Sequence, residues 1–203
     1  MNLFSRWRQS RRAAFWLLGA ERISVCVLRR ERDEPYLEAC AGIRSSQRLD
    51  GMSFTPGILE LARAVEAFSL PCVAALGAEF ARLVPFADAE PAAEGDTSRV
   101  IGRIVGFENL RVEADTDAVV AAWGLFARAH LDLRELDAEP CAERALALFL
   151  GNTASQDPHR DVLAAVSVDP TLEPKAVELG GLLVAPVGLA IARWSAIGNT
   201  LAD

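Results

Sequence analysis

Three short apolar segments near the start of the chain, each bounded by turn residues, constrain the fold more than any other part of the sequence. Residues 13–18 are apolar throughout, residues 22–29 are β-branched and partly alternating, and residues 36–43 form a third such run. The linking segments, 19–22 and 33–35, are only a few residues long. Links this short join antiparallel strands, because a parallel pair needs a crossover of about a dozen residues or more. The sequence therefore predicts an antiparallel three-stranded meander.

Helical and strand-like periodicities alternate through the rest of the chain. The predicted helices cover, in order, about 55–70, 115–130, 140–150 and 186–197. The predicted strands cover 72–76, 80–86, 131–137 and 162–168, and 101–112 is predicted as extended structure broken at Gly106, with a surface loop over 87–97. Strands interleaved with helices indicate an α/β or α+β fold.

Two of the predicted helices have an apolar face that supplies candidate core residues. In the first helix, apolar side chains recur at helical spacing at Ile58, Leu61, Ala62, Val65 and Phe68. In the second helix, the corresponding side chains are Val119, Val120, Trp123 and Phe126. We expect both faces to be buried.

Composition places the chain among folded, acidic proteins of one domain or two small ones. Of its 203 residues 51% are hydrophobic, and 21 Lys and Arg stand against 28 Asp and Glu, which gives a net charge of −7. A chain of this size buries roughly 70% of its unfolded surface, so intrinsic disorder is not expected. The acidic balance argues against a nucleic-acid binder, which needs clustered Lys and Arg.

The N-terminal end differs from the rest of the chain in being basic. Residues 1–32 hold eight arginines and two glutamates, a net charge of +6, which leaves −13 for the remainder. We predict a basic arm over residues 1–12 that contacts an anionic membrane surface or an acidic partner. The contact residues predicted in this arm are Arg6, Trp7, Arg8, Arg11 and Arg12. A purely solubilising arm is the alternative.

The cysteines are predicted to be buried structural side chains. They are widely spaced, lie in apolar stretches and form no C-x-x-C pair: Cys26, Cys40, Cys72 and Cys141. Because no pair of histidines lies near them, a zinc site is not expected.

The sequence also gives no strong targeting signal. The basic start followed by the apolar run 13–20 superficially resembles an export signal, but Glu21 and Arg22 interrupt the run, so export is not expected. No segment reaches the roughly 18 apolar residues of a membrane-spanning helix, and residues 179–192 come closest.

No sequence motif carries an obvious catalytic chemistry. One acidic cluster comprises Asp132, Glu135, Asp137 and Glu139. In a regular strand these side chains do not share one face, so we predict a turn after Leu136 in preference to paired catalytic carboxylates. No G-x-S-x-G motif occurs that would supply a nucleophilic serine for His130 or His159. No Walker loop, G-x-G-x-x-G or H-E-x-x-H occurs either. The pair Gly180-Gly181 is interpreted as a turn, with close approach to a nucleotide as the alternative.

Several of these segments together resemble the PilM family of type IV pilus assembly proteins, including its shorter relatives of HofM type. The resemblance is carried by the opening meander, the small-residue turn within 74–85, the strand and helix start at 133–142, and the closing Gly-Leu-Ala helix at 188–192. It implies an actin-like (ribonuclease H-like) lobe with a mixed sheet flanked by helices. It also implies a single reduced domain over 13–203, within which about 44–115 is a candidate inserted subdomain.

The resemblance places a degenerate nucleotide site at the first turn of the meander. In the family this turn faces the phosphates and the metal of a bound nucleotide; the matching residues here are Leu17, Gly19, Glu21 and Ser24, of which only the glycine is kept. Leu17 cannot ligate a cation through water, and Glu21 would repel phosphate. The family's second lobe is reduced to about 151–179. We therefore expect no ATP binding, no metal and no cofactor.

The function that the resemblance implies is that of a non-enzymatic scaffold. Such a protein is cytoplasmic, peripheral to the inner membrane, and helps to assemble a type IV pilus or a related secretion apparatus. In the family it holds the N-terminal tail of a PilN-type inner-membrane protein as an extended peptide. Two alternatives stay open: a nucleotide-binding actin-like ATPase, and a cytoplasmic component of a type II secretion assembly platform.

Overall fold

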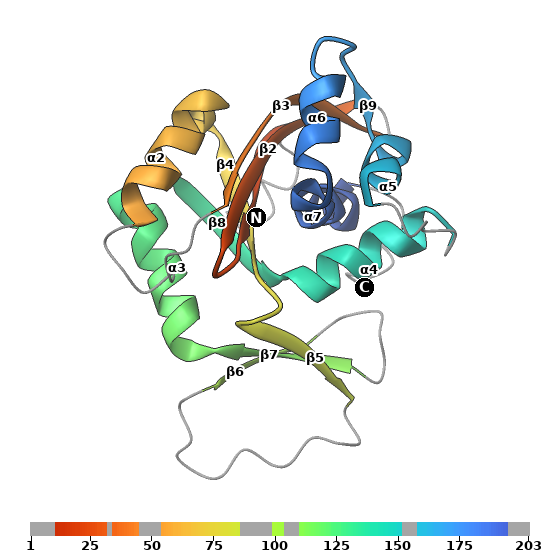
Figure 1. Ribbon diagram of the computed structural model, residues 1–203. Helices are drawn as coiled ribbons and strands as arrows, with labels where there is room; N and C mark the ends of the chain where they lie inside the picture. The colour runs from red at the N-terminus through yellow and green to blue at the C-terminus, as the bar shows by residue number, and fades with distance from the viewer. Residues whose placement is uncertain are drawn as a thin grey trace, which may run out of the picture.

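The computed structural model shows a central mixed sheet with helices on both faces and a second, smaller sheet beside it (Figure 1). It describes residues 11–31, 34–44, 54–85, 99–103, 110–151 and 158–194. The predicted α/β class, a mixed sheet flanked by helices, is confirmed.

Six strands form the central sheet, and the predicted meander lies in its middle. The strands in spatial order are β8 (Asp132–Ala138), β4 (Pro71–Leu76), β1 (Arg12–Leu18), β2 (Arg22–Glu31), β3 (Glu34–Arg44) and β9 (Ser167–Val168). The pairs β1–β2 and β2–β3 are antiparallel, whereas β4, β8 and β9 join the sheet by parallel pairing. Parallel neighbours need crossover connections, which is why helices lie on the faces of this sheet.

The alternation of side chains along β1 divides the hydrophobic core into two clusters. Trp16 points to the face covered by α2 (Phe54–Ala64) and α3 (Thr116–Arg128). Phe15 points to the opposite face, which α7 (Val184–Trp194) covers (Figure 1). Because both faces are buried, β1 is apolar on both sides, as its sequence shows.

The remaining helices pack mainly on the α7 side of the sheet. They are α4 (Glu139–Phe149), α5 (Pro158–Ala165), α6 (Glu173–Leu179) and the 3-10 helix η4 (Gly180–Leu183); the short η2 (Ala67–Ser69) follows α2. Helices α4 and α7 cross closely at Gly188, where an added Cβ would lie 2.0 Å from the carbonyl oxygen of Ala142. Only glycine fits at this crossing.

The smaller sheet has three antiparallel strands in the order β5 (Ala81–Pro85), β7 (Leu110–Asp115) and β6 (Arg99–Arg103). Arg82 on β5 lies opposite Glu113 on β7, and their side chains form an ion pair at 2.9 Å. The hydrogen bond from Arg82 holds the pKa of Glu113 below its usual range, so the pair stays ionised near neutral pH.

The predicted extended segments of this region are confirmed in part. The strand expected over 80–86 is β5. The extended structure expected over 101–112 consists of two strands, β6 and β7, and the predicted break at Gly106 falls in residues 104–109, which lie outside the described part of the chain. The assignment of residues 13–203 to one domain, with 44–115 as an insertion, stays a prediction. Of the segments within residues 44–115, β4 belongs to the central sheet, where it lies between β8 and β1.

The strand predicted over 162–168 is wrong, because most of this segment lies in helix α5. Its buried residues Val162, Ala165 and Val166 recur at helical spacing, and only Ser167–Val168 continues as the short strand β9. Seven residues rich in Val and Ala fit either period, so the pattern alone did not decide between them. Helix α6, which begins with Glu173-Pro174, was not predicted.

The apolar face predicted for the helix at 115–130 is also partly wrong. Val120 and Trp123 are 64% and 43% exposed, respectively, whereas the buried stripe of α3 is Ala118, Ala122, Leu125 and Phe126. The prediction assigned the large apolar side chains of this helix to the buried face. In the structure the small side chains of Ala118 and Ala122 complete the stripe that packs on the sheet. In α2 the predicted face is buried, but Phe68, in η2, is 41% exposed.

The C-terminal helix begins at Val184, two residues before the predicted start, and its predicted end at 197 lies outside the described residues. Together with α6 and η4 it makes one stretch, Glu173–Trp194, that is long and apolar enough to cross a membrane by length and composition alone. Most of its apolar window, 61%, is buried inside the protein. This burial is expected of a core helix, and α7 accordingly fills the cluster against Phe15.

Candidate functional site

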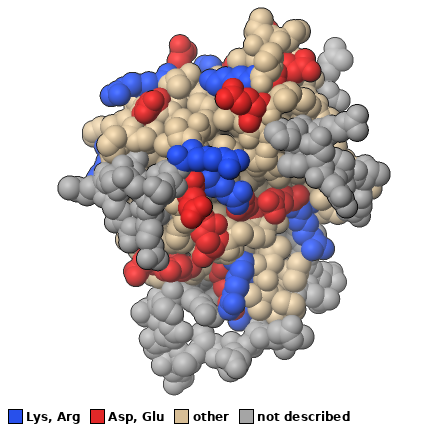
Figure 2. Space-filling model, viewed as in Figure 1, with Lys and Arg blue, Asp and Glu red and all other residues tan. Residues whose placement is uncertain are grey.

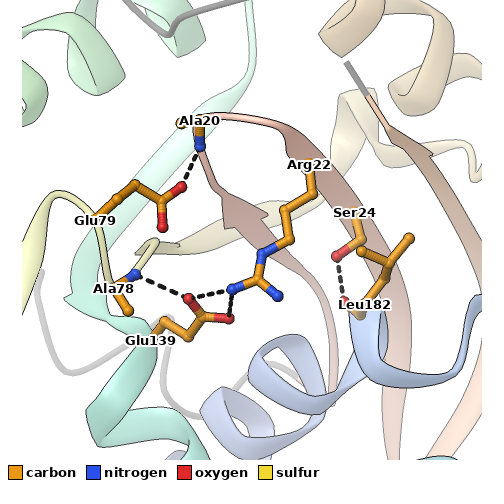
Figure 3. Close-up of polar contacts among 7 residues, drawn as sticks. All are labelled: Ala20, Arg22, Ser24, Ala78, Glu79, Glu139 and Leu182. Carbon is orange, nitrogen blue, oxygen red and sulfur yellow. Dashed lines mark hydrogen bonds and ion pairs between the residues drawn. The ribbon is translucent and has the colours of Figure 1, made fainter. Parts of the chain in front are cut away.

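The turn between β1 and β2 holds the residues of the predicted degenerate site, but it does not direct them to a common point. Leu17 is fully buried in the core, and Ser24 lies directly opposite it in the strand pair. The Ser24 hydroxyl is buried and donates to the carbonyl oxygen of Leu182 (Figure 3). Glu21 is exposed at the tip, and the Gly19 N–H closes the turn by donating to the Arg22 carbonyl at 2.8 Å.

Two carboxylates from elsewhere in the sequence occupy the donor groups of this turn. The backbone N–H of Ala20 donates to Glu79, which follows β4 (Figure 3). The Arg22 guanidinium donates to both oxygens of Glu139, at 2.7 and 2.8 Å, and the Ala78 N–H donates to Glu139 at 2.9 Å. The turn is therefore satisfied by anionic groups that the chain itself supplies.

Glu139 is the more deeply placed of these two carboxylates. It is the first residue of α4 and is only 2% exposed, whereas Glu79 lies at the surface. A buried carboxylate is tolerated where donors surround it, and the positive end of a helix dipole favours a negative charge. Here the Arg22 guanidinium and the Ala78 N–H provide those donors.

Two glycines leave room for the Glu79 carboxylate. A Cβ added at Gly77 would lie 2.7 Å from one Glu79 oxygen, and a Cβ at Gly19 would lie 3.0 Å from the other. Side chains at these positions would push the carboxylate off the turn. Gly19, the one residue of this turn that matches the PilM pattern, thus makes space for the Glu79 carboxylate.

Sequence reasoning missed Arg22, Ala78 and Glu79 as site residues and assigned Glu139 only to the acidic cluster. The partners Arg22 and Glu139 are 117 positions apart, so no local pattern joins them. The one available signal was a glutamate directly before the proline that opens a helix, a place where a helix dipole stabilises negative charge.

The rest of the acidic cluster is also held by arginines. The predicted turn after Leu136 is wrong, since β8 continues to Ala138 with a register irregularity opposite Cys72 and Val73. Glu135 and Asp137 lie two positions apart after this irregularity, so they face the same side of the strand, and both accept from the buried Arg193 of α7. Both carboxylates therefore anchor α7 to the edge strand.

The described residues contain no group of three or more His, Cys, Asp or Glu side chains that could hold a metal ion. The cysteines in them are free thiols; Cys26, Cys40 and Cys72 are buried, as predicted, whereas Cys141 is only half-buried. Burial raises the pKa of Cys72 to about 12. A thiol with such a pKa is not a nucleophile at neutral pH.

Only the end of the predicted basic arm lies in the described part of the chain. Arg6, Trp7 and Arg8 fall outside it. Arg11 is the first described residue and is exposed. Arg12 belongs to β1 rather than to an arm, because it pairs with Glu38 of β3. On the face shown in Figure 2, basic and acidic side chains lie side by side and form no broad surface of one sign.

Comparisons with known proteins agree with this architecture. The sequence matches no described family and no curated protein. Among solved structures, a chain of the "PilM-PilN type IV pilus biogenesis complex" superposes with a TM-score of 0.63 at 14% identity, covering 90% of this chain and 98% of that one.

Two further structures give lower scores. The cytoplasmic domain of EpsL, "an inner membrane component of the type II secretion system of Vibrio cholerae", matches with a TM-score of 0.46 at 12% identity over 64% of this chain and 57% of that one. A Bacteroides thetaiotaomicron protein "with actin-like ATPase fold and unknown function" matches with a TM-score of 0.43 at 9% identity over 78% and 62%. At these identities a likeness shows the fold alone, and the fold of this chain is similar to that of the matching chain in the PilM-PilN complex.

Proposed function

We propose that this protein is a non-enzymatic, cytoplasmic scaffold of a type IV pilus or a related secretion apparatus, which binds the N-terminal tail of a PilN-type inner-membrane protein. The observation that carries the proposal is the turn between β1 and β2, whose donors are held by Glu79 and Glu139 in a PilM-like fold. In a turn filled in this way, carboxylates occupy the Ala20 N–H and the Arg22 guanidinium in place of a phosphate, while the shape of the fold is kept.

An extended tail would find unpaired backbone groups on the smaller sheet. Among the described strands, β5 bonds only to β7, so its other side is a sheet edge. An extended peptide adds to such an edge through main-chain hydrogen bonds, and alternate side chains give specificity. Recognition of this kind depends on shape and needs no catalytic group.

Fluorescence anisotropy with a labelled peptide tests the proposal. A peptide with the first residues of a PilN-type protein from the same cell should bind saturably, and a scrambled peptide of the same composition should not. Equal binding of the two peptides, or binding of neither, would contradict the proposed role.

Peripheral association with the inner membrane is the second part of the proposal. It rests on the basic character of the N-terminal segment, in which Arg6, Arg8 and Arg11 surround Trp7. Each basic side chain near an anionic leaflet contributes about 1 kcal/mol to membrane binding.

Deleting residues 1–10 should therefore weaken co-sedimentation with vesicles that contain an anionic lipid, and added salt should weaken wild-type binding in the same way. The deletion leaves Arg12 and its pair with Glu38 in place, so β1 is kept. Arg134→Ala, which removes an exposed arginine on β8, is the matched control and should bind as wild type does. Undiminished sedimentation of the deletion variant would refute a membrane role for this segment.

A further inference from the structure

The smaller sheet joins the central sheet through two crossing points of the chain. On the first, the Gly77 N–H donates to the carbonyl oxygen of Leu18 at the end of β1, at 2.9 Å. On the second, the Asp115 N–H donates to the carbonyl oxygen of Phe80, also at 2.9 Å. The first crossing segment is thus hydrogen-bonded to the central sheet, whereas the bond between the two segments continues the β5–β7 pairing and belongs to the smaller sheet, so the two short segments have the arrangement of a hinge.

The two carboxylates of the turn lie across this hinge. Glu79 belongs to the first crossing segment and accepts from Ala20 in the β1–β2 turn. Glu139 begins α4 and accepts both from Ala78 in the crossing segment and from Arg22 of β2. Together they connect the central sheet, the crossing segment and α4 (Figure 3).

We propose that Glu79 and Glu139 form a latch that fixes the orientation of the smaller sheet, and that breaking the latch lets β5, β6 and β7 open as a unit. Charge-assisted hydrogen bonds are stronger than neutral ones, so the four that Glu79 and Glu139 accept resist rotation of the crossing segment against the central sheet. The inference deepens the proposed function, since the latch governs the placement of the β5 edge that is proposed to take the tail. Its test needs no partner.

Amide hydrogen exchange on the full chain measures the opening directly. Glu79→Ala removes the exposed half of the latch, and Glu139→Gln removes the charge of the buried half while keeping its shape. In both variants we expect the Gly77 amide, which bonds across to Leu18 of β1, to exchange roughly ten- to a hundredfold faster than in wild type, while amides inside β1–β2 and inside the β5–β7 pair stay unchanged. Glu60→Ala, on the exposed face of α2, is the matched control and should match wild type.

The pattern of exchange decides the outcome. Unchanged exchange at Gly77 would overturn the latch, and so would an equal acceleration in every strand, because that result reports lower global stability. Glu79→Ala keeps the test valid if Glu139→Gln does not fold, since Glu79 lies at the surface. Failure of peptide binding with the predicted exchange pattern would reject the proposed function and leave the latch standing.

Discussion

Replacing Gly188 with alanine is expected to lower the free energy of unfolding by about 3 kcal/mol. The added methyl group would lie 2.0 Å from the carbonyl oxygen of Ala142 and 2.5 Å from its carbonyl carbon. Both are backbone atoms of α4, so no side chain can move aside to relieve the overlap. The two helices would have to separate, and the urea midpoint of unfolding should fall accordingly.

Gly124→Ala is the matched control for this change. A Cβ at Gly124 would meet only the end of the Arg128 side chain, at 3.2 Å, and Gly124 lies inside α3. Alanine is favoured over glycine in a helix interior by roughly 1 kcal/mol, so this variant should be as stable as wild type or more stable. A Gly188→Ala protein with the wild-type midpoint would show that α4 and α7 do not cross as closely as described.

Replacing Trp16 with alanine should cost about 3–5 kcal/mol of stability, because it empties the centre of the core between the sheet and α3. Trp16 is fully buried and meets the Phe126 ring edge-on, with 5.4 Å between ring centroids. For a chain of this length, a loss of that size corresponds to a drop of roughly 10 °C in the melting temperature.

The matched control uses the same residue type at the surface. Trp123 lies on the outer face of α3 and is 43% exposed, so Trp123→Ala should change the melting temperature little. Calorimetry on both variants separates the two positions. Equal losses for Trp16→Ala and Trp123→Ala would mean that the sheet-facing side of α3 has been assigned wrongly.

The parts of the fold that the sequence predicted are those set by local pattern. The meander was predicted because its short turns and apolar runs are contiguous, and α3 was predicted because Asp115 is an N-cap whose side chain accepts from Asp117 and Ala118. Both features depend on residues close together in the chain, which a pattern can detect.

The candidate site shows why the rest was missed. Its contacts join the turn at residues 20–22 to Glu79 and Glu139, and such long-range pairs leave no periodic trace in the sequence. The side of α3 that faces the sheet was misjudged because alanines, not the larger Val120, complete the buried stripe. In β8 the irregularity near Arg134 changed which side chains share a face.

The chain's own carboxylates fill the turn between β1 and β2, and we propose that this turn therefore takes no nucleotide. The most direct measurement is an NMR titration of the wild-type protein with magnesium and ATP, following the backbone amides of Gly19, Ala20 and Ala78. We predict that these resonances stay in place up to millimolar ATP. Saturable shifts at these three amides would contradict the account and favour an actin-like ATPase.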